Sequence, residues 1–157
     1  LIYSRVKYGI SLYSQAAKFK VQRIQTLQNQ LIKVLAHKHY RYPTNVLHNE
    51  FNFLKVKDIA NQEILTFVHN YFANKLPPVF DNYFVTYATC HDRNTRSGST
   101  QIKPPRFNTK IADLSIKFTG AKIWNELSND LKSISNSKIF RRQYKNLILP
   151  YVTNSNA

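Results

Sequence analysis

Residues 13–40, YSQAAKFKVQRIQTLQNQLIKVLAHKHY, contain the most regular hydrophobic pattern in the chain. Apolar residues recur there at steps of three and four, which is the spacing of one helix face and predicts an amphipathic α-helix. The residues predicted to form its buried face are Ala17, Val21, Ile24, Leu27, Leu31 and Leu35. The opposite face would present polar and basic side chains, among them Lys18, Arg23 and Lys33.

Two further helices are predicted in the next part of the chain. The first helix should end before Pro43, because the residue that precedes a proline is disfavoured in the helical conformation. A short helix over 46–53, with Thr44 as its N-cap, comes next. A longer helix opens near Asp58 and stops at the Leu-Pro-Pro sequence of residues 76–78.

Residues 86–110 have the composition of a basic loop. They contain glycine, two adjacent prolines and several serine, threonine and asparagine residues, with at most a short strand at 84–88 where the loop begins. A loop of this length in a compact domain is usually functional or disordered. Its basic residues are Arg93, Arg96, Lys103, Arg106 and Lys110.

The C-terminal part of the chain is predicted to form a short strand and two helices. Alternating apolar residues predict the strand over 114–118, and a short helix over 121–127 would hold Trp124. The last helix would begin at Ser137 as its N-cap and end at Leu149. Its predicted apolar face consists of Phe140, Tyr144, Leu147 and Ile148. Its predicted basic face consists of Lys138, Arg141, Arg142 and Lys145.

These patterns predict a mainly α fold with a short β element. The expected division is a helical module over 1–85, the basic loop over 86–110 and a small module over 111–157. No apolar run approaches the ~20 residues that a membrane helix needs, so no membrane partner is predicted. The chain contains no methionine and begins at Leu1, which indicates a fragment or processed product of a longer protein.

Charge is the strongest functional signal in the sequence. Twenty-three lysine and arginine residues stand against eight acidic residues, which gives a net charge of +15. Residues 1–42 hold eight of the basic residues and no acidic one, whereas residues 43–85 hold three basic and four acidic residues. Such a balance is typical of proteins that bind polyanions, nucleic acids above all. A basic surface that serves only solubility is the alternative interpretation.

Residues suited to catalysis or metal binding are sparse. The eight carboxylates are scattered, whereas two-metal catalysis needs carboxylates that converge on a pair of ions. Three glycines do not make a glycine-rich phosphate loop, and the single cysteine, Cys90, does not make a zinc finger. His37, His39 and His91 are therefore interpreted as surface or packed side chains. No catalytic residue, metal site or cofactor is predicted in this chain.

A series of short motifs, in order along the chain, resembles one protein family. The motifs are YGISLY at 8–13, FLKVKDI at 53–59, LPPVF at 76–80, NTRS at 94–97 and SIKFTGAKIWNEL at 115–127. Together they resemble the C-terminal region of the reverse-transcriptase polyprotein of LINE-type, non-LTR retrotransposons of the Jockey-like and chicken-repeat-like clades. The resemblance covers almost the whole chain and implies its thumb-side and post-thumb region, with residues 1–85 as a thumb-like module.

The resemblance also implies a function. The endonuclease and the RNA-directed DNA polymerase palm, with its Mg²⁺-binding carboxylates, would lie upstream in the parent, so this fragment alone would not be an enzyme. It would contact template RNA or the target-primed duplex during target-primed reverse transcription. Its partners would be RNA or DNA and the upstream palm, without a membrane or a small-molecule substrate. A retrotransposon ribonucleoprotein would place it in the nucleus and cytoplasm, and it would not be secreted.

Sequence-independent phosphate contacts by lysine and arginine are the expected binding mode. The candidate contact residues are Lys18, Arg23, Lys33, Arg93, Arg96, Lys103, Arg106, Lys110, Lys138, Arg141, Arg142 and Lys145. Two other functions remain open: a module whose basic surface binds an acidic protein, and a free-standing helical RNA-binding protein of organellar or ribosomal type.

Several aromatic residues and one motif have two interpretations. Trp124 could stack on a base or anchor a core, and a core position is favoured. The NTRS motif at 94–97 could clamp a phosphate or pin the loop to the fold. The tyrosines at positions 8, 13, 40 and 42 could stack on RNA bases, although half-buried packing is favoured.

Overall fold

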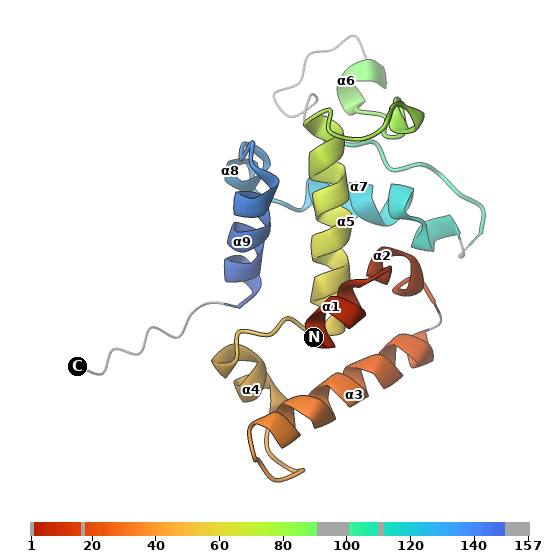
Figure 1. Cartoon of the computed structure of the whole chain (residues 1–157). Helices are drawn as coiled ribbons and strands as arrows, with labels where there is room; N and C mark the ends of the chain where they lie inside the picture. The colour runs from red at the N-terminus through yellow and green to blue at the C-terminus, as the bar shows by residue number, and fades with distance from the viewer. Residues whose placement is uncertain (1, 17, 91–100, 110–111, 150–157) are drawn as a thin grey trace. The chain divides into compact units, whose positions relative to one another are not determined.

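The computed structural model is mainly helical, as the sequence predicts (Figure 1). It describes residues 2–16, 18–90, 101–109 and 112–149. In chain order the elements are α1 (Ile2–Lys7), α2 (Ile10–Tyr13), α3 (Lys18–Leu35), α4 (Thr44–Glu50), α5 (Val56–Phe72), η1 (Pro78–Phe80), α6 (Tyr87–Cys90), η2 (Ala112–Leu114), α7 (Ile116–Asn125), α8 (Asn129–Lys132) and α9 (Ser137–Ile148).

The chain forms two compact units. Unit 1 comprises Leu1–Gln62 and Arg142–Ala157, and unit 2 comprises Glu63–Arg141. These boundaries differ from the predicted segments 1–85, 86–110 and 111–157. The end of the chain's last helix joins unit 1 because the buried Leu149 lies in the same apolar cluster as Ile10 and Leu54.

The core of unit 1 surrounds the start of α5. Half-buried Val21 and Ile24 of α3 pack against the cluster of buried residues. The buried members of that cluster are Ile10, Leu54, Val56, Ile59, Ala60 and Leu149. Burial of this much aliphatic surface is the main driving force for folding of the unit, at roughly 25 cal/mol per Å² of apolar area.

The buried face of α3 differs from the predicted one. Leu27 and Leu35 are 64% and 55% exposed, so their assignment to the buried face was wrong. Gln28 and Ile32 are buried instead. The reason is polar: Gln28 Nε2 donates to the Leu54 carbonyl at 2.8 Å, which holds α3 against the segment before α5. A pattern of apolar residues alone could not reveal a face that contains a glutamine.

Three helices end in the same way, with a non-glycine residue in the left-handed conformation. These residues are His37 after α3, Asn52 after α4 and Asn74 after α5, with φ of 51°, 53° and 52°. After α3 the main-chain N–H of Lys38 donates to the Lys33 carbonyl at 3.0 Å, which is the six-to-one bond of a Schellman motif. The helix α4 therefore stops earlier than the predicted 46–53.

Two predicted N-caps are also corrected. The N-cap position of α4 is Pro43, and Thr44 is the first residue of the helix. At α9, Ser137 is likewise the first helical residue, and the side-chain oxygen of Asn136 accepts from the Lys138 main-chain N–H at 2.9 Å. Asn136 thus performs the capping role predicted for Ser137.

The predicted strand at 114–118 is wrong, because this segment belongs to η2 and α7. The Ser115 hydroxyl oxygen accepts from the Phe118 N–H at 3.3 Å and starts α7 as its N-cap. Gly120, which lies between the predicted strand and the predicted helix over 121–127, is within α7. A Cβ there would lie 3.1 Å from a Val68 methyl group, so a small residue lets α7 approach α5 closely. The alternation of apolar residues does not match the helical face that is buried.

Residues 84–88 do not form a strand either. Tyr87–Cys90 is the short helix α6, and Thr86 makes an isolated antiparallel bridge with Ile102. The side chain of Asn125 binds both main-chain groups of the buried Ile102, at 2.9 Å and 2.7 Å. This pair of bonds attaches the second part of the basic loop, around Ile102, to α7.

An aromatic stack forms the centre of unit 2. The rings of Phe72 and Trp124 are stacked with their centroids 5.2 Å apart, and the centroids of the Trp124 and Phe140 rings are 6.2 Å apart. Phe140 in turn stacks on His69 at 4.7 Å. Trp124 is buried, so its interpretation as a core anchor is confirmed.

Candidate nucleic-acid interface

The cations predicted along α3 are not equivalent in the structure. Arg23 is exposed on the face opposite the core. Lys33 is half-buried at the end of the helix, where its ammonium donates to the Tyr40 carbonyl. The side chain of Lys18 lies outside the described side chains. Of the two predicted α3 cations whose side chains are described, Arg23 is therefore the better placed to reach a phosphate.

Five exposed cations of unit 1 were not among the candidate contact residues. One of them, Lys20, lies on α3. The other four lie before α4 or at the start of α5, and they are Lys38, Arg41, Lys55 and Lys57. The sequence shows that these residues are basic, but their exposure could not be predicted because it depends on which face of each segment packs against the core.

Unit 1 contains two carboxylates, Glu50 and Asp58, against twelve lysine and arginine residues. Glu50 is exposed, while Asp58 is half-buried in the first turn of α5. Burial raises the pKa of the Asp58 carboxyl above its ordinary value, although Lys55 and Lys57 act in the other direction. The unit therefore has a large excess of positive charge that its own acids do not balance.

The four cations predicted to share one face of α9 also differ in exposure and in their contacts. Lys138 and Arg142 are exposed, and Lys145 is half-buried. Arg141 binds the Glu63 carboxylate at 2.9 Å and the Thr66 hydroxyl at 3.0 Å, both on α5. Arg141 was thus wrongly grouped with the freely exposed cations, because its guanidinium joins α9 to α5 within unit 2.

The candidates from the basic loop are only partly described. Lys103 and Arg106 are exposed in the segment that follows the isolated bridge. Arg93, Arg96, Lys110 and the NTRS motif at 94–97 lie outside the described residues. The loop remains a predicted contact region.

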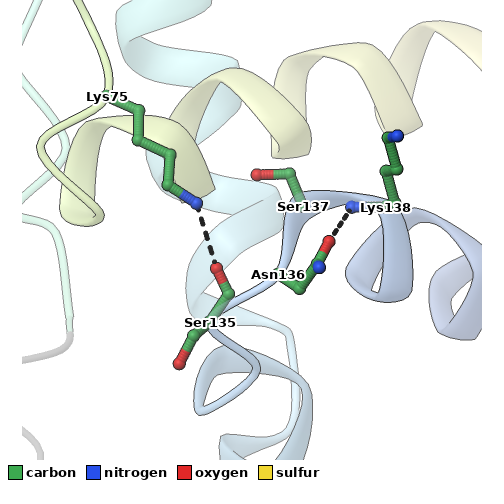
Figure 2. Close-up of a pocket in the computed structure, with 5 residues that line it drawn as sticks. All are labelled: Lys75, Ser135, Asn136, Ser137 and Lys138. Carbon is green, nitrogen blue, oxygen red and sulfur yellow. Dashed lines mark hydrogen bonds between the residues drawn. The ribbon is translucent and has the colours of Figure 1, made fainter.

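A basic pocket of about 530 Å³ lies where α9 begins in unit 2, as Figure 2 shows. Two lysines, Lys75 and Lys138, line it together with the segment 135–137. The Lys75 ammonium donates to the Ser135 carbonyl at 3.2 Å, and the Asn136 amide oxygen is occupied by the Lys138 N–H. These bonds engage the Lys75 ammonium and the Asn136 amide oxygen within the chain.

The four tyrosines considered for base stacking fall into two pairs. Tyr13 and Tyr42 are half-buried, in agreement with packing, and the Tyr13 hydroxyl donates to the Val6 carbonyl. Tyr8 and Tyr40 are 87% and 66% exposed, so the favoured packing interpretation is wrong for them. Tyr40 differs from Tyr8 in that its ring also contacts His39 and Arg41.

Two buried histidines, His48 and His69, are held by the fold. His48 Nδ1 lies 2.9 Å from the Phe53 carbonyl oxygen, and Nε2 lies 3.0 Å from Asn29 Oδ1. Burial lowers the pKa of the His48 imidazole, while the Phe53 contact and Asp58 favour the charged ring. His69 Nε2 donates to the Ile134 carbonyl at 2.5 Å. Among the described residues, no group of three or more His, Cys, Asp or Glu side chains is arranged to hold a metal ion.

No protein-family model matches this chain, and no curated protein or solved structure matches it significantly. Within the described residues, none of the helices has both the length and the apolar character needed to cross a membrane.

Proposed function

We propose that this chain is a nucleic-acid-binding, non-catalytic region of a LINE-type reverse transcriptase. The carrying observation is the charge of unit 1, whose twelve basic and two acidic residues give it a net charge of +10. Many of these cations are exposed, including Lys20 and Arg23 on α3 and Arg142 on α9. Exposed cations of this number neutralise phosphates and release counterions on binding.

The family assignment within this proposal rests on the motif order along the sequence. In the parent polyprotein, an upstream palm would supply the Mg²⁺ site and the chemistry, and this region would hold the template or the target-primed duplex. The compartment would be that of the ribonucleoprotein, in the nucleus and cytoplasm.

The proposal is tested by measuring the dissociation constant for labelled RNA, DNA and duplex over a range of salt concentrations. The logarithm of the affinity should fall linearly with the logarithm of salt concentration, with a slope of roughly −0.9 for each phosphate contact on a duplex. Replacing Arg23 and Arg142 by glutamine should reduce that slope by about 2. Lys75→Gln is the matched control, because the Lys75 ammonium is engaged with Ser135. A slope near zero for the unmodified chain would contradict the proposal.

An acidic protein partner is the second candidate, favoured by the outer face of α3. Phe19, Leu27 and Val34 are exposed there, on the same side as Arg23. Apolar side chains with cations between them suit an acidic amphipathic helix. Leu27→Ser with Val34→Ser should leave nucleic-acid binding unchanged and abolish binding of such a helix.

A further inference from the structure

The turn between α3 and α4 combines exposed rings with exposed cations. Residues 37–42 have the sequence HKHYRY. The Arg41 guanidinium carbon lies 5.2 Å from the centre of the Tyr40 ring, and the Lys38 ammonium lies 5.3 Å from that of Tyr42. The rings of His39 and Tyr40 are 4.3 Å apart. Two cations and four rings are thus gathered in six consecutive residues.

Hydrogen bonds fix this turn at its start and near its middle. The Schellman motif at His37 fixes its start, and the Lys33 ammonium donates to the Tyr40 carbonyl near its middle. The Tyr42 N–H donates to the His39 carbonyl at 2.9 Å. A turn fixed in this way loses little further conformational freedom when a ligand binds, which favours affinity.

The Tyr40 ring is exposed even though it has partners within the turn. Its hydroxyl oxygen accepts from Arg41 Nε at 2.7 Å, and the guanidinium lies over the ring. The side chain remains 66% exposed. The surrounding charge is positive, since Lys38 and Arg41 are exposed and the chain has no acidic residue before Glu50.

We infer that the α3–α4 turn is a stacking site for the bases of a single-stranded nucleic acid. This inference rests on the proposed function and adds to it the strand form that is recognised. An unstacked base presents a flat face that can lie on the Tyr40 ring, while Lys38 and Arg41 contact the flanking phosphates. The bases of an intact duplex are already stacked, so a duplex would meet only the cations.

The test uses the full chain and fluorescence anisotropy with labelled oligo(dT) and oligo(rU) of about 12 nucleotides, and with a blunt duplex of the same length. Tyr40→Leu should weaken single-strand binding by about 5- to 150-fold, which corresponds to 1 to 3 kcal/mol at 1.4 kcal/mol for each factor of ten. Duplex binding should stay the same. Tyr40→Phe keeps the ring and should retain most of the single-strand affinity.

Tyr8→Leu is the matched control, because Tyr8 is an exposed tyrosine of the same unit outside the turn. It should leave single-strand affinity unchanged. The inference is overturned if Tyr40→Leu binds single strands normally, weakens duplex binding equally, or has the same effect as Tyr8→Leu. If the unmodified chain binds neither form at low salt, the proposed function fails and the stacking site fails with it.

Discussion

The contacts that stabilise unit 1 internally differ in kind from those that stabilise unit 2 internally. In unit 1 a series of hydrogen bonds supplements the aliphatic cluster: the Val56 N–H donates to Gln25 Oε1 at 2.8 Å, and Gln25 Nε2 donates to Asn29 Oδ1 at 2.8 Å. Asn29 Oδ1 also faces His48 Nε2. In unit 2 the centre is the ring stack of Phe72, Trp124, Phe140 and His69.

The two units also differ in charge and in how they use it. Unit 1 has a net charge of +10, while unit 2 has eleven basic and six acidic residues. In unit 2 the Arg141–Glu63 pair is part of the packing between helices. The comparison teaches that a basic residue in unit 1 is more often a candidate for contact with a partner, whereas a basic residue in unit 2 has to be checked for a structural role.

The largest expected effect is in the ring stack. Phe140 is fully buried between His69 and Trp124, so Phe140→Ala should destabilise unit 2 by roughly 3–5 kcal/mol through lost burial and a cavity. Urea unfolding followed by the fluorescence of Trp124, the single tryptophan, measures this effect. Nucleic-acid affinity of the folded variant at low temperature should change little. A loss below about 1 kcal/mol would mean that the stack is not the centre of the unit.

A smaller effect should separate two neighbouring arginines. Arg141→Glu would place a second carboxylate beside Glu63 and remove the bond to Thr66, which should cost about 1–2 kcal/mol because Arg141 is 35% exposed and its ion pair is partly screened. Arg142→Glu should change the free energy of unfolding by less than about 0.5 kcal/mol, because Arg142 is exposed. It should weaken nucleic-acid binding more than Arg141→Glu does, because the Arg141 guanidinium is engaged with Glu63 and Thr66.

Thermal melting and anisotropy measurements on the two single variants give this comparison directly. Equal melting temperatures for Arg141→Glu and Arg142→Glu would contradict the structural role of Arg141.

The smallest expected effect is the pH dependence of unit 1. Because burial lowers the pKa of His48 in the folded chain, the unfolded chain binds the proton more readily. The His48 contribution is therefore complete above its ordinary pKa of about 6.5 and is lost as the pH falls towards the lowered value, by at most about 1.4 kcal/mol per pH unit. The raised pKa of Asp58 has the opposite sign and acts at lower pH.

Urea midpoints by circular dichroism at about pH 7.5 and pH 5.5 measure this dependence. His48→Gln should lower stability at both values and reduce the difference between them. A difference as large in the variant as in the unmodified chain would assign the pH dependence to another group.

Part of the candidate interface follows from the sequence alone. The excess of basic residues before position 43, and the exposure of Arg23 opposite a helical core face, could be predicted from charge and periodicity. The structural role of Arg141 could not, because Glu63 is far from it in the chain and only packing of α9 on α5 brings the two together. The stacking turn was visible only as a run of rings and cations.

The sequence by itself determined that the chain is mainly helical and that its charge is strongly positive. These properties depend on local periodicity and on composition. The ends of the long helices were misplaced: α3 ends at Leu35 and α5 at Phe72, well before the prolines that were expected to stop them. Tertiary structure alone decided that Gln28 rather than Leu27 faces the core, and that Gly120 of α7 packs closely against α5. In both cases the deciding interaction, a hydrogen bond to Leu54 or close packing of Gly120 on Val68, joins residues distant in the chain.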